Sequence, residues 1–185
     1  MKNVIYTLGL GVCLLSAGSS FAGQFRLTSP DIQDGKMMSK THEFQGFGCT
    51  GDNQSPALEW HNAPEGTKSF AVLVHDRDAP TGSGWWHWQV INIPAKTQSL
   101  PRDAGNIHGA MLPKGAMQIE SDYGTAAFGG ACPPPGHGVH HYTFTVHALS
   151  GNLDLPATAS GALVGYMVNA NTIEKASIEA LYERK

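Results

Sequence analysis

The stretch His140-His141-Tyr142-Thr143-Phe144-Thr145-Val146-His147-Ala148-Leu149 has the clearest periodicity in the chain. Four apolar or aromatic residues and one histidine occupy every second position from His140 to Ala148, and threonine and histidine fill the positions between them. Successive side chains of a strand point to opposite faces of a sheet. The alternation therefore predicts a strand over 140–149 whose even-numbered side chains face the core.

Other apolar runs predict further strands. Residues 70–74 follow the turn Pro64-Glu65-Gly66 and are apolar throughout, which suits a strand buried on both faces. Residues 86–93 form a second run, which Pro94 closes. Near the C-terminus, Ile178, Ala180 and Tyr182 alternate, which indicates a short final strand.

One helix is expected before that final strand. Ser160 is a favoured N-cap residue, and a set of apolar residues recurs at helical spacing after it: Leu163, Tyr166, Met167, Ala170 and Ile173. This pattern predicts an amphipathic helix over about 160–174. Strands followed by one late helix indicate a mainly β fold, an antiparallel β protein with a peripheral C-terminal helix.

The composition is that of a single folded domain. The chain has 185 residues, of which 41% are hydrophobic and only 15% charged, so the signature of intrinsic disorder is absent. Glycine and proline together make up 33 residues, which favours turns and short strands over a helical bundle. The net charge is −3 with no cluster of Lys and Arg, which argues against nucleic acid as a partner. Any bound anion must therefore be held by local groups.

The N-terminus resembles an export signal. Met1-Lys2-Asn3 precedes an apolar run from Val4 to Leu15, and a segment of mostly small residues ends at Ala22. We expect a signal peptide over 1–22, cleavage after Ala22, and a single domain over 23–185 in the periplasm or secreted from the cell. The apolar run is shorter than a bilayer requires, so no integral membrane segment is expected.

Two cysteines remain after cleavage, because Cys13 is lost with the signal. Cys49 and Cys132 form an even pair in an exported chain, and an oxidising compartment favours a disulfide. Both lie in glycine-rich loops. A bridge that closes about 80 residues would stabilise the fold by ~4 kcal/mol in the chain-entropy model. The alternative is two buried, unpaired thiols.

Acidic and histidine residues gather at the ends of the predicted strands. Asp76-Arg77-Asp78-Ala79-Pro80 follows one strand, Trp85-Trp86-His87-Trp88 opens the next, and His140 opens the strand over 140–149. If these strands are neighbours, carboxylates and imidazoles meet at one edge of the sheet. A further informative stretch runs from Ser121-Asp122-Tyr123 to the glycine- and proline-rich loop over 129–138.

These motifs resemble those of the phosphatidylethanolamine-binding protein family, also called the Raf kinase inhibitor-like family. Asp76-x-Asp78-Ala79-Pro80 with Trp85-x-His87 is similar to its first signature, and Gly138-x-His140-x-Tyr142 after Pro133-Pro134 to its second. Asn53-x-Ser55-Pro56-x-Leu58-x-Trp60 resembles a segment upstream of both. The resemblance covers essentially the whole mature chain, and the signal and cysteine pair suggest an exported bacterial branch.

The resemblance implies a large central antiparallel sheet with a smaller sheet against it, and a small pocket for a phosphate-like anion. The implied pocket residues are Asp76, His87 and His140, with Asp78, Pro80, Trp85 and Tyr142 lining or supporting the site. The loop at Gly130 and Cys132 would offer backbone N–H groups. Two residues depart from the common pattern: Arg77 stands where many members have proline, and His141 where many have arginine.

The residues themselves also suit an anion. Imidazoles, backbone N–H groups and a tyrosine hydroxyl can hold a phosphate in an acidic protein. Asp76 is expected to bond an imidazole, fix its tautomer and raise its pKa, so that the ring donates as a cation. It could equally accept from a ligand ammonium group, as in ethanolamine. The remaining histidines are expected to be solvated or structural: His42, His61, His75, His108, His137 and His147.

These residues and motifs are compatible with several functions. The leading one is a non-catalytic periplasmic binding protein for a phosphate-type ligand or phospholipid head group, with no cofactor. The alternative is an inhibitor module with an envelope or extracellular protein partner, since family members are linked to inhibition of kinases or proteases. A hydrolase is disfavoured because no nucleophile is motif-paired with a histidine. A zinc site is disfavoured because metal-ligand spacing is missing. A homodimer is expected only from similar bacterial proteins.

Overall fold

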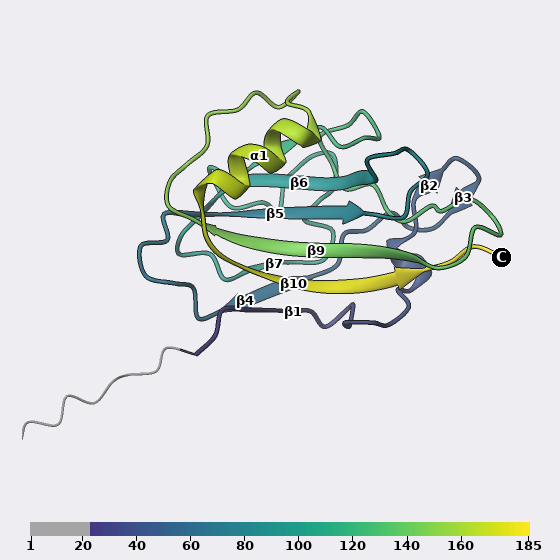
Figure 1. Cartoon of the computed structure of the whole chain (residues 1–185), viewed down its shortest axis with the longest axis horizontal. Coiled ribbons are helices and arrows are strands. Elements are labelled where there is room, and N and C mark those ends of the chain that lie inside the picture. Colours follow the sequence, from purple (N-terminus) through teal and green to yellow (C-terminus); the bar gives the residue numbers. More distant parts are fainter. Residues whose placement is uncertain (1–22) are drawn as a thin grey trace, which may run out of the picture.

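The structure is a computed structural model that describes residues 23–185, so the predicted signal peptide lies outside the described part (Figure 1). Its large sheet has five strands in the order β10 (Thr172–Tyr182), β9 (His140–Leu149), β5 (Ser69–Asp76), β6 (Trp85–Pro94) and β8 (Met117–Ile119). All neighbours in this sheet are antiparallel. A smaller sheet contains β1 (Arg26–Thr28), β4 (Leu58–His61) and β7 (Ser99–Leu100). The predicted mainly β fold with two sheets is confirmed.

The remaining elements are short. The 3-10 helix η1 (Lys40–His42) precedes a hairpin of β2 (Gln45–Gly46) and β3 (Cys49–Thr50). The helix α1 (Gly161–Asn171) lies between β9 and β10 in the sequence and contacts β6 and β9. Within residues 23–185, no helix is long and apolar enough to cross a bilayer.

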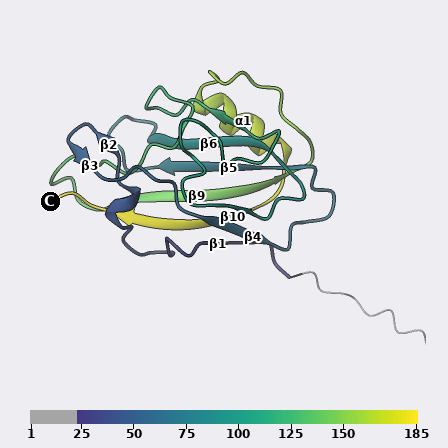
Figure 2. The ribbon, with the colours of Figure 1, turned by 180° about the vertical axis from the view of Figure 1, so that it is seen from behind.

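The central strand β5 is buried on both faces, as its continuous apolar run predicts. Phe70, Val72 and Val74 belong to a core that also contains side chains of the small sheet, such as Trp60. Ala71 and Leu73 belong to a second core on the other face, beneath α1. Figure 1 shows α1 alongside β6, and Figure 2 shows the small-sheet strands β1 and β4 from behind. The large sheet is therefore covered on both sides.

The helix is shorter than predicted and buries a different face. Its N-cap is Ser160, whose hydroxyl accepts a hydrogen bond from the Leu163 backbone N–H, as expected. However, Leu163 and Tyr166 are exposed, and Ile173 belongs to β10. The buried residues are Gly161, Val164, Gly165 and Val168. The helix carries apolar side chains on more than one face, so their spacing alone could not predict which face packs against the sheet.

Close approach to one tryptophan selects that face instead. A Cβ atom added at Gly161 would lie 2.2 Å from the Trp86 ring, which no real side chain tolerates. Glycine therefore allows the start of α1 to rest directly on Trp86. The final strand also differs from its prediction, because β10 begins at Thr172, immediately after the helix. Ile178, Ala180 and Tyr182 lie in this strand, as predicted, and all three are buried.

Gly161→Ala should lower the free energy of unfolding by about 1–3 kcal/mol, because the methyl group overpacks against Trp86. The matched control is Gly165→Ala in the same helix, where the new Cβ would lie at an ordinary 3.7 Å from Trp86. The control should be neutral or stabilising, because alanine favours helix by about 1 kcal/mol over glycine. Urea unfolding measures both variants. Equal effects of the two substitutions would contradict the proposed basis of helix packing.

Candidate functional site

The site forms where β5 ends and where β6 and β9 begin. The strand register places Asp76 opposite Trp85 on one side and opposite Tyr142 on the other, so these three residues form one row. His87 and His140 lie two residues along β6 and β9, on the same face as Trp85 and Tyr142. The sheet therefore brings carboxylate and imidazoles together, as the sequence predicted.

A cavity of about 190 Å³ opens at this edge. Of the nine predicted site residues, seven line it: Asp76, Pro80, Trp85, His87, Cys132, His140 and Tyr142. Pro133, Pro134, Phe47 and Tyr123 contribute further, mostly apolar wall. The cavity thus combines a polar floor with an apolar mouth.

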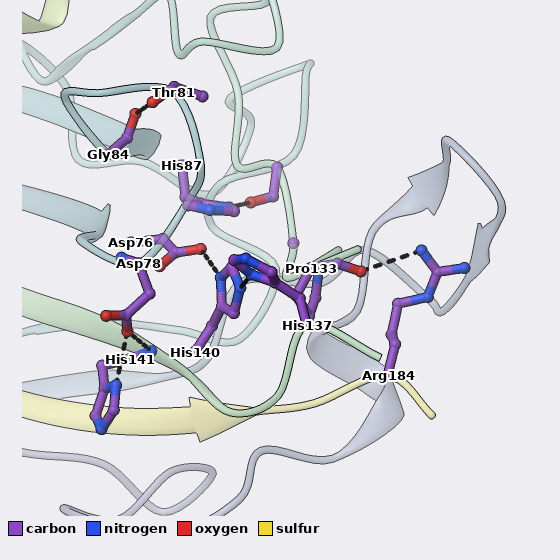
Figure 3. Close-up of polar contacts among 12 residues, drawn as sticks. Asp76, Asp78, Thr81, Gly84, His87, Pro133, His137, His140, His141 and Arg184 are labelled. Atoms are coloured by element: carbon purple, nitrogen blue, oxygen red, sulfur yellow. Dashed lines mark hydrogen bonds and ion pairs between the residues drawn. The ribbon is translucent and has the colours of Figure 1, made fainter. Parts of the chain in front are cut away.

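The buried carboxylate of Asp76 is held from two sides. Its Oδ1 accepts the Asp78 backbone N–H at 2.9 Å, and its Oδ2 accepts Nδ1–H of His140 at 2.7 Å. Both side chains of the Asp76–His140 pair are almost fully buried. The expectation that Asp76 fixes an imidazole tautomer fits this geometry. Figure 3 shows His140 between Asp76 and a third residue, His137.

His137 is a site residue that the sequence did not reveal. Its Nδ1 lies 2.7 Å from Nε2 of His140, although His137 itself is exposed. The chain Asp76–His140–His137 therefore runs from the buried floor to solvent. Positive φ angles of 73° at Gly136 and 91° at Gly138 turn the backbone around His137. The alternation of glycine and histidine was visible in the sequence, but nothing in it predicted contact between the two rings.

His87 behaves differently from the predicted cationic donor. Its Nδ1–H donates to the Gly129 carbonyl at 2.7 Å, which leaves Nε2 as the acceptor nitrogen of a neutral ring. Burial lowers the pKa of His87 to about 4, despite the opposing effects of Gly129 and the Asp76 charge. His87 is therefore not the imidazole that Asp76 was expected to bond and charge, because loss of solvation outweighs the nearby carboxylate.

Two donors in the wall have no partner. The Trp85 indole Nε1 and the Tyr142 hydroxyl are buried, and neither has a hydrogen-bond partner within residues 23–185. Burial raises the pKa of Tyr142, and so do the charge of Asp76 and the closeness of that carboxylate to the hydroxyl, so the hydroxyl keeps its proton. Both residues line the cavity, and the two donor atoms are themselves buried.

The predicted role of Gly130 is wrong. Its backbone N–H donates to Asn53 Oδ1 at 2.7 Å, and its carbonyl accepts the Tyr123 hydroxyl at 2.9 Å. A Cβ at this position would lie 2.4 Å from the His42 carbonyl oxygen. Gly130 therefore packs against the η1 region and does not line the cavity. Its N–H is unavailable to a ligand.

The two departures from the family pattern lie outside the cavity. His141 donates its backbone N–H and its Nδ1–H to Asp78, at 2.8 and 2.7 Å. Partial burial would raise the pKa of Asp78, but these hydrogen bonds lower it below the usual value. Arg77 pairs with Glu179 of β10. Asp78 thus supports the turn, and the charge of Arg77 is matched outside the site.

A disulfide joins the cavity wall to the β2–β3 hairpin. Cys49 of β3 and Cys132 are bridged with their Cα atoms 6.0 Å apart, as predicted. Phe47 lies in the hairpin turn with a φ of 51° and reaches the cavity rim. Arg184 donates to the carbonyls of Pro133 and Gly48, on both sides of the bridge. The disulfide and the hydrogen bonds of Arg184 together hold this wall of the cavity in place.

Comparison with known proteins identifies the family. The sequence profile described as "Phosphatidylethanolamine-binding protein" matches residues 28–183. YbcL of Escherichia coli (strain K12) is 52% identical over 186 residues, which cover 100% of both chains. The chain belongs to the phosphatidylethanolamine-binding protein family. The family that the sequence motifs resemble is therefore confirmed. Its description names a binding protein, in agreement with the expected non-catalytic role.

Further relatives support this assignment. YbhB of Escherichia coli (strain K12) is 48% identical over 158 residues, which cover 85% of this chain and 99% of that protein. The crystal structure of Escherichia coli YbcL, described as a new member of the mammalian PEBP family, matches with a TM-score of 0.86 and 55% identity. The match covers 88% of this chain and 100% of that one. Sequence and structure therefore agree on the family and on its fold.

The protein should lose stability as the pH falls from about 6.5 to about 4. Burial lowers the pKa of His147, like that of His87, to about 4, and the charge of Lys175 adds to the effect. The unfolded chain takes up protons on these rings near pH 6.5, before the folded chain can do so. The free energy of unfolding should therefore fall with pH, by up to about 3 kcal/mol for each ring.

Urea unfolding at several pH values checks this expectation. His147→Gln should give a shallower fall than the wild type, because one ring no longer titrates in the unfolded chain. The exposed His108→Gln serves as the control and should keep the full slope. A His147→Gln variant with the wild-type slope would show that another group controls acid unfolding.

Proposed function

We propose that the cavity binds a phosphate-type anion, either a small phosphate ester or the head group of a phospholipid. The observation that carries this proposal is the pair of unpartnered donors, Trp85 Nε1 and the Tyr142 hydroxyl. A buried donor without a partner costs ~1–3 kcal/mol. An oxyanion that accepts from both groups removes this cost, and an apolar ligand would not.

The floor can accept an anion although it contains a carboxylate. Both oxygens of Asp76 already accept hydrogen bonds, from the Asp78 backbone and from His140. When His140 is protonated, the Asp76–His140 pair is neutral overall, so it does not repel an anion. A ligand ammonium group would have to compete for an engaged carboxylate and would leave the two donors unsatisfied. The arrangement therefore favours a phosphate at the floor.

The size and walls of the cavity indicate what part of a ligand enters. About 190 Å³ is small compared with the ~300–1,000 Å³ of drug-sized sites. This space suits a head group, and the acyl chains of a phospholipid would remain outside. The exposed lining residues Pro80, Pro134 and Phe47 give the mouth an apolar surface. Such a surface suits the glycerol side of a lipid or the organic part of a small ester.

Hydrolysis gains no support from the cavity. Cys132 is held in the disulfide, and the Thr81 hydroxyl donates to the Gly84 carbonyl, so neither is positioned as an activated nucleophile. Within residues 23–185, no three His, Cys, Asp or Glu side chains are grouped to hold a metal ion. The inhibitor function, the protein partner and the homodimer stay predictions.

Tyr142→Phe should weaken binding of phosphoethanolamine about tenfold, because it removes one hydrogen bond to the anion and keeps the ring. Calorimetry measures the affinity, and Tyr166→Phe on the exposed face of α1 is the matched control. Sedimentation with phosphatidylethanolamine vesicles distinguishes the two ligand sources. Binding to vesicles alone assigns a membrane lipid, and binding to phosphoethanolamine assigns a soluble ester or accessible head group. Equal affinities of wild type and Tyr142→Phe would contradict the proposed donor.

We also propose that the mature protein is exported. The disulfide supports an oxidising compartment, and residues 1–22 carry the pattern of a signal peptide. Intact-mass analysis of periplasmic protein should give a chain that begins at Gly23 and has two hydrogens fewer than the reduced form. A chain that retains Met1–Ala22, or that carries two free thiols, would contradict export or bridge formation, respectively.

A further inference from the structure

The contact between His140 and His137 places constraints on protons. Two ring nitrogens lie 2.7 Å apart, so one of them must carry a hydrogen and the other a lone pair. The two rings also differ in environment. The His140 side chain is 1% exposed, whereas His137 is open to solvent. The contact therefore connects a buried site to water through a single hydrogen bond.

The three hydrogen-bonded residues Asp76, His140 and His137 can hold two different numbers of protons. In the first, both rings are neutral: His140 donates Nδ1–H to Asp76, His137 donates Nδ1–H to His140, and His137 Nε2 has a lone pair. The net charge of Asp76, His140 and His137 is then −1. In the second, one more proton is present and the net charge is zero. An anion in the cavity favours the second state by electrostatics.

We propose that an oxyanion binds to this cavity together with one proton, and that His137 is the residue through which the proton enters. The proton binds to Nε2 of His137 from solvent. The hydrogen on His137 Nδ1 then transfers to Nε2 of His140. His137 ends as a neutral ring with its hydrogen on Nε2, and His140 ends as an imidazolium paired with Asp76. No other bond forms or breaks, and one proton is gained.

This transfer solves a physical problem of the site. His140 is buried with both nitrogens engaged, so solvent cannot protonate it directly. Entry at His137 moves positive charge to the cavity floor without any opening of the fold. His137 is a positioning residue, since it acts on the ligand through His140. The inference rests on the proposed function, because it concerns the same anion.

Other charged and titratable groups surround the chain. Tyr182 of β10 lies opposite His140 in the register and donates its hydroxyl to Glu43. Arg184 is engaged with loop carbonyls beside Cys132. The titratable side chains that line the cavity with His140 are Asp76, His87, Tyr123 and Tyr142. Of these, His87 is the other ring that could gain a proton, and its burial disfavours the cation near neutral pH.

Calorimetry with sulfate tests the proposal, because the charge of sulfate stays constant over the pH range used. Titrations at about pH 8 in buffers with different ionisation enthalpies give the number of protons taken up. The wild type should take up close to one proton per sulfate. By linkage, its sulfate affinity should rise by up to about tenfold for each pH unit between pH 8 and pH 6.

His137→Asn separates this mechanism from a structural role. The asparagine amide can hydrogen-bond to His140 Nε2 from nearly the position of the imidazole Nδ1, as donor or, after the amide turns, as acceptor, but it cannot take a proton from solvent and pass one on. The number of protons taken up at equilibrium should therefore stay close to that of the wild type. The uptake after rapid mixing with sulfate, followed with a pH indicator, should be clearly slower than in the wild type. His108→Asn, at another exposed histidine, is the matched control and should behave like the wild type.

The outcomes distinguish this inference from the function on which it rests. Sulfate binding by the wild type without proton uptake would overturn the inference and leave the anion site intact. Uptake by His137→Asn at the wild-type rate would also overturn it, because the proton would then enter by another route. No binding of sulfate, phosphate or phosphoethanolamine at any pH would remove the anion site itself.

Discussion

The buried carboxylate of Asp76 is the constraint on which the site depends. A charged side chain with 4% exposure requires close partners, and a missing partner typically costs several kcal/mol. Asp76 obtains them from the backbone of Asp78 and from His140. The turn after β5 and the start of β9 must therefore stay where these bonds need them. The cavity lies directly above this arrangement.

The two faces of the large sheet separate binding from support at this edge. Side chains of Asp76, His87, His140 and Tyr142 point to the cavity face. The neighbouring His141 donates hydrogen bonds to Asp78, and Arg77 pairs with Glu179, both outside the cavity. Because successive residues of a strand alternate, adjacent histidines in the sequence have different tasks. A change at Arg77 or His141 therefore reaches the ligand only through the position of the turn.

Much of the fold could be predicted because the patterns were strong. The alternation over 140–149 and the apolar run over 70–74 each matched an observed strand, and the cysteine pair matched the disulfide. The face of α1 that packs against the sheet could not be predicted, because apolar side chains lie on more than one face of the helix. The absence of a side chain at Gly161 is what allows the close contact with Trp86. Short strands such as β7 and β8 carry too few residues for a period to show.

The sequence predicted most of the residues that meet at the site, but it did not predict their protonation states or hydrogen-bond partners. Motif order placed Asp76, His87 and His140 together, but the protonation of His87 depends on burial, which no local sequence pattern reports. The backbone N–H of Gly130, which was expected to bind the ligand, donates instead to Asn53, a residue 77 positions away. His137 required the backbone turn between two glycines to reach His140. These errors share one cause: each depends on a tertiary contact that sequence patterns do not encode.

A crystal structure of the mature protein with phosphoethanolamine would show which end of the ligand the cavity floor binds. We expect the phosphoryl oxygens to lie at the cavity floor, within hydrogen-bond distance of the Tyr142 hydroxyl and Trp85 Nε1, and the amine to point toward the mouth. A ligand bound the other way, with its ammonium group on Asp76 and its phosphate in solvent, would contradict the claim that the floor binds the anion.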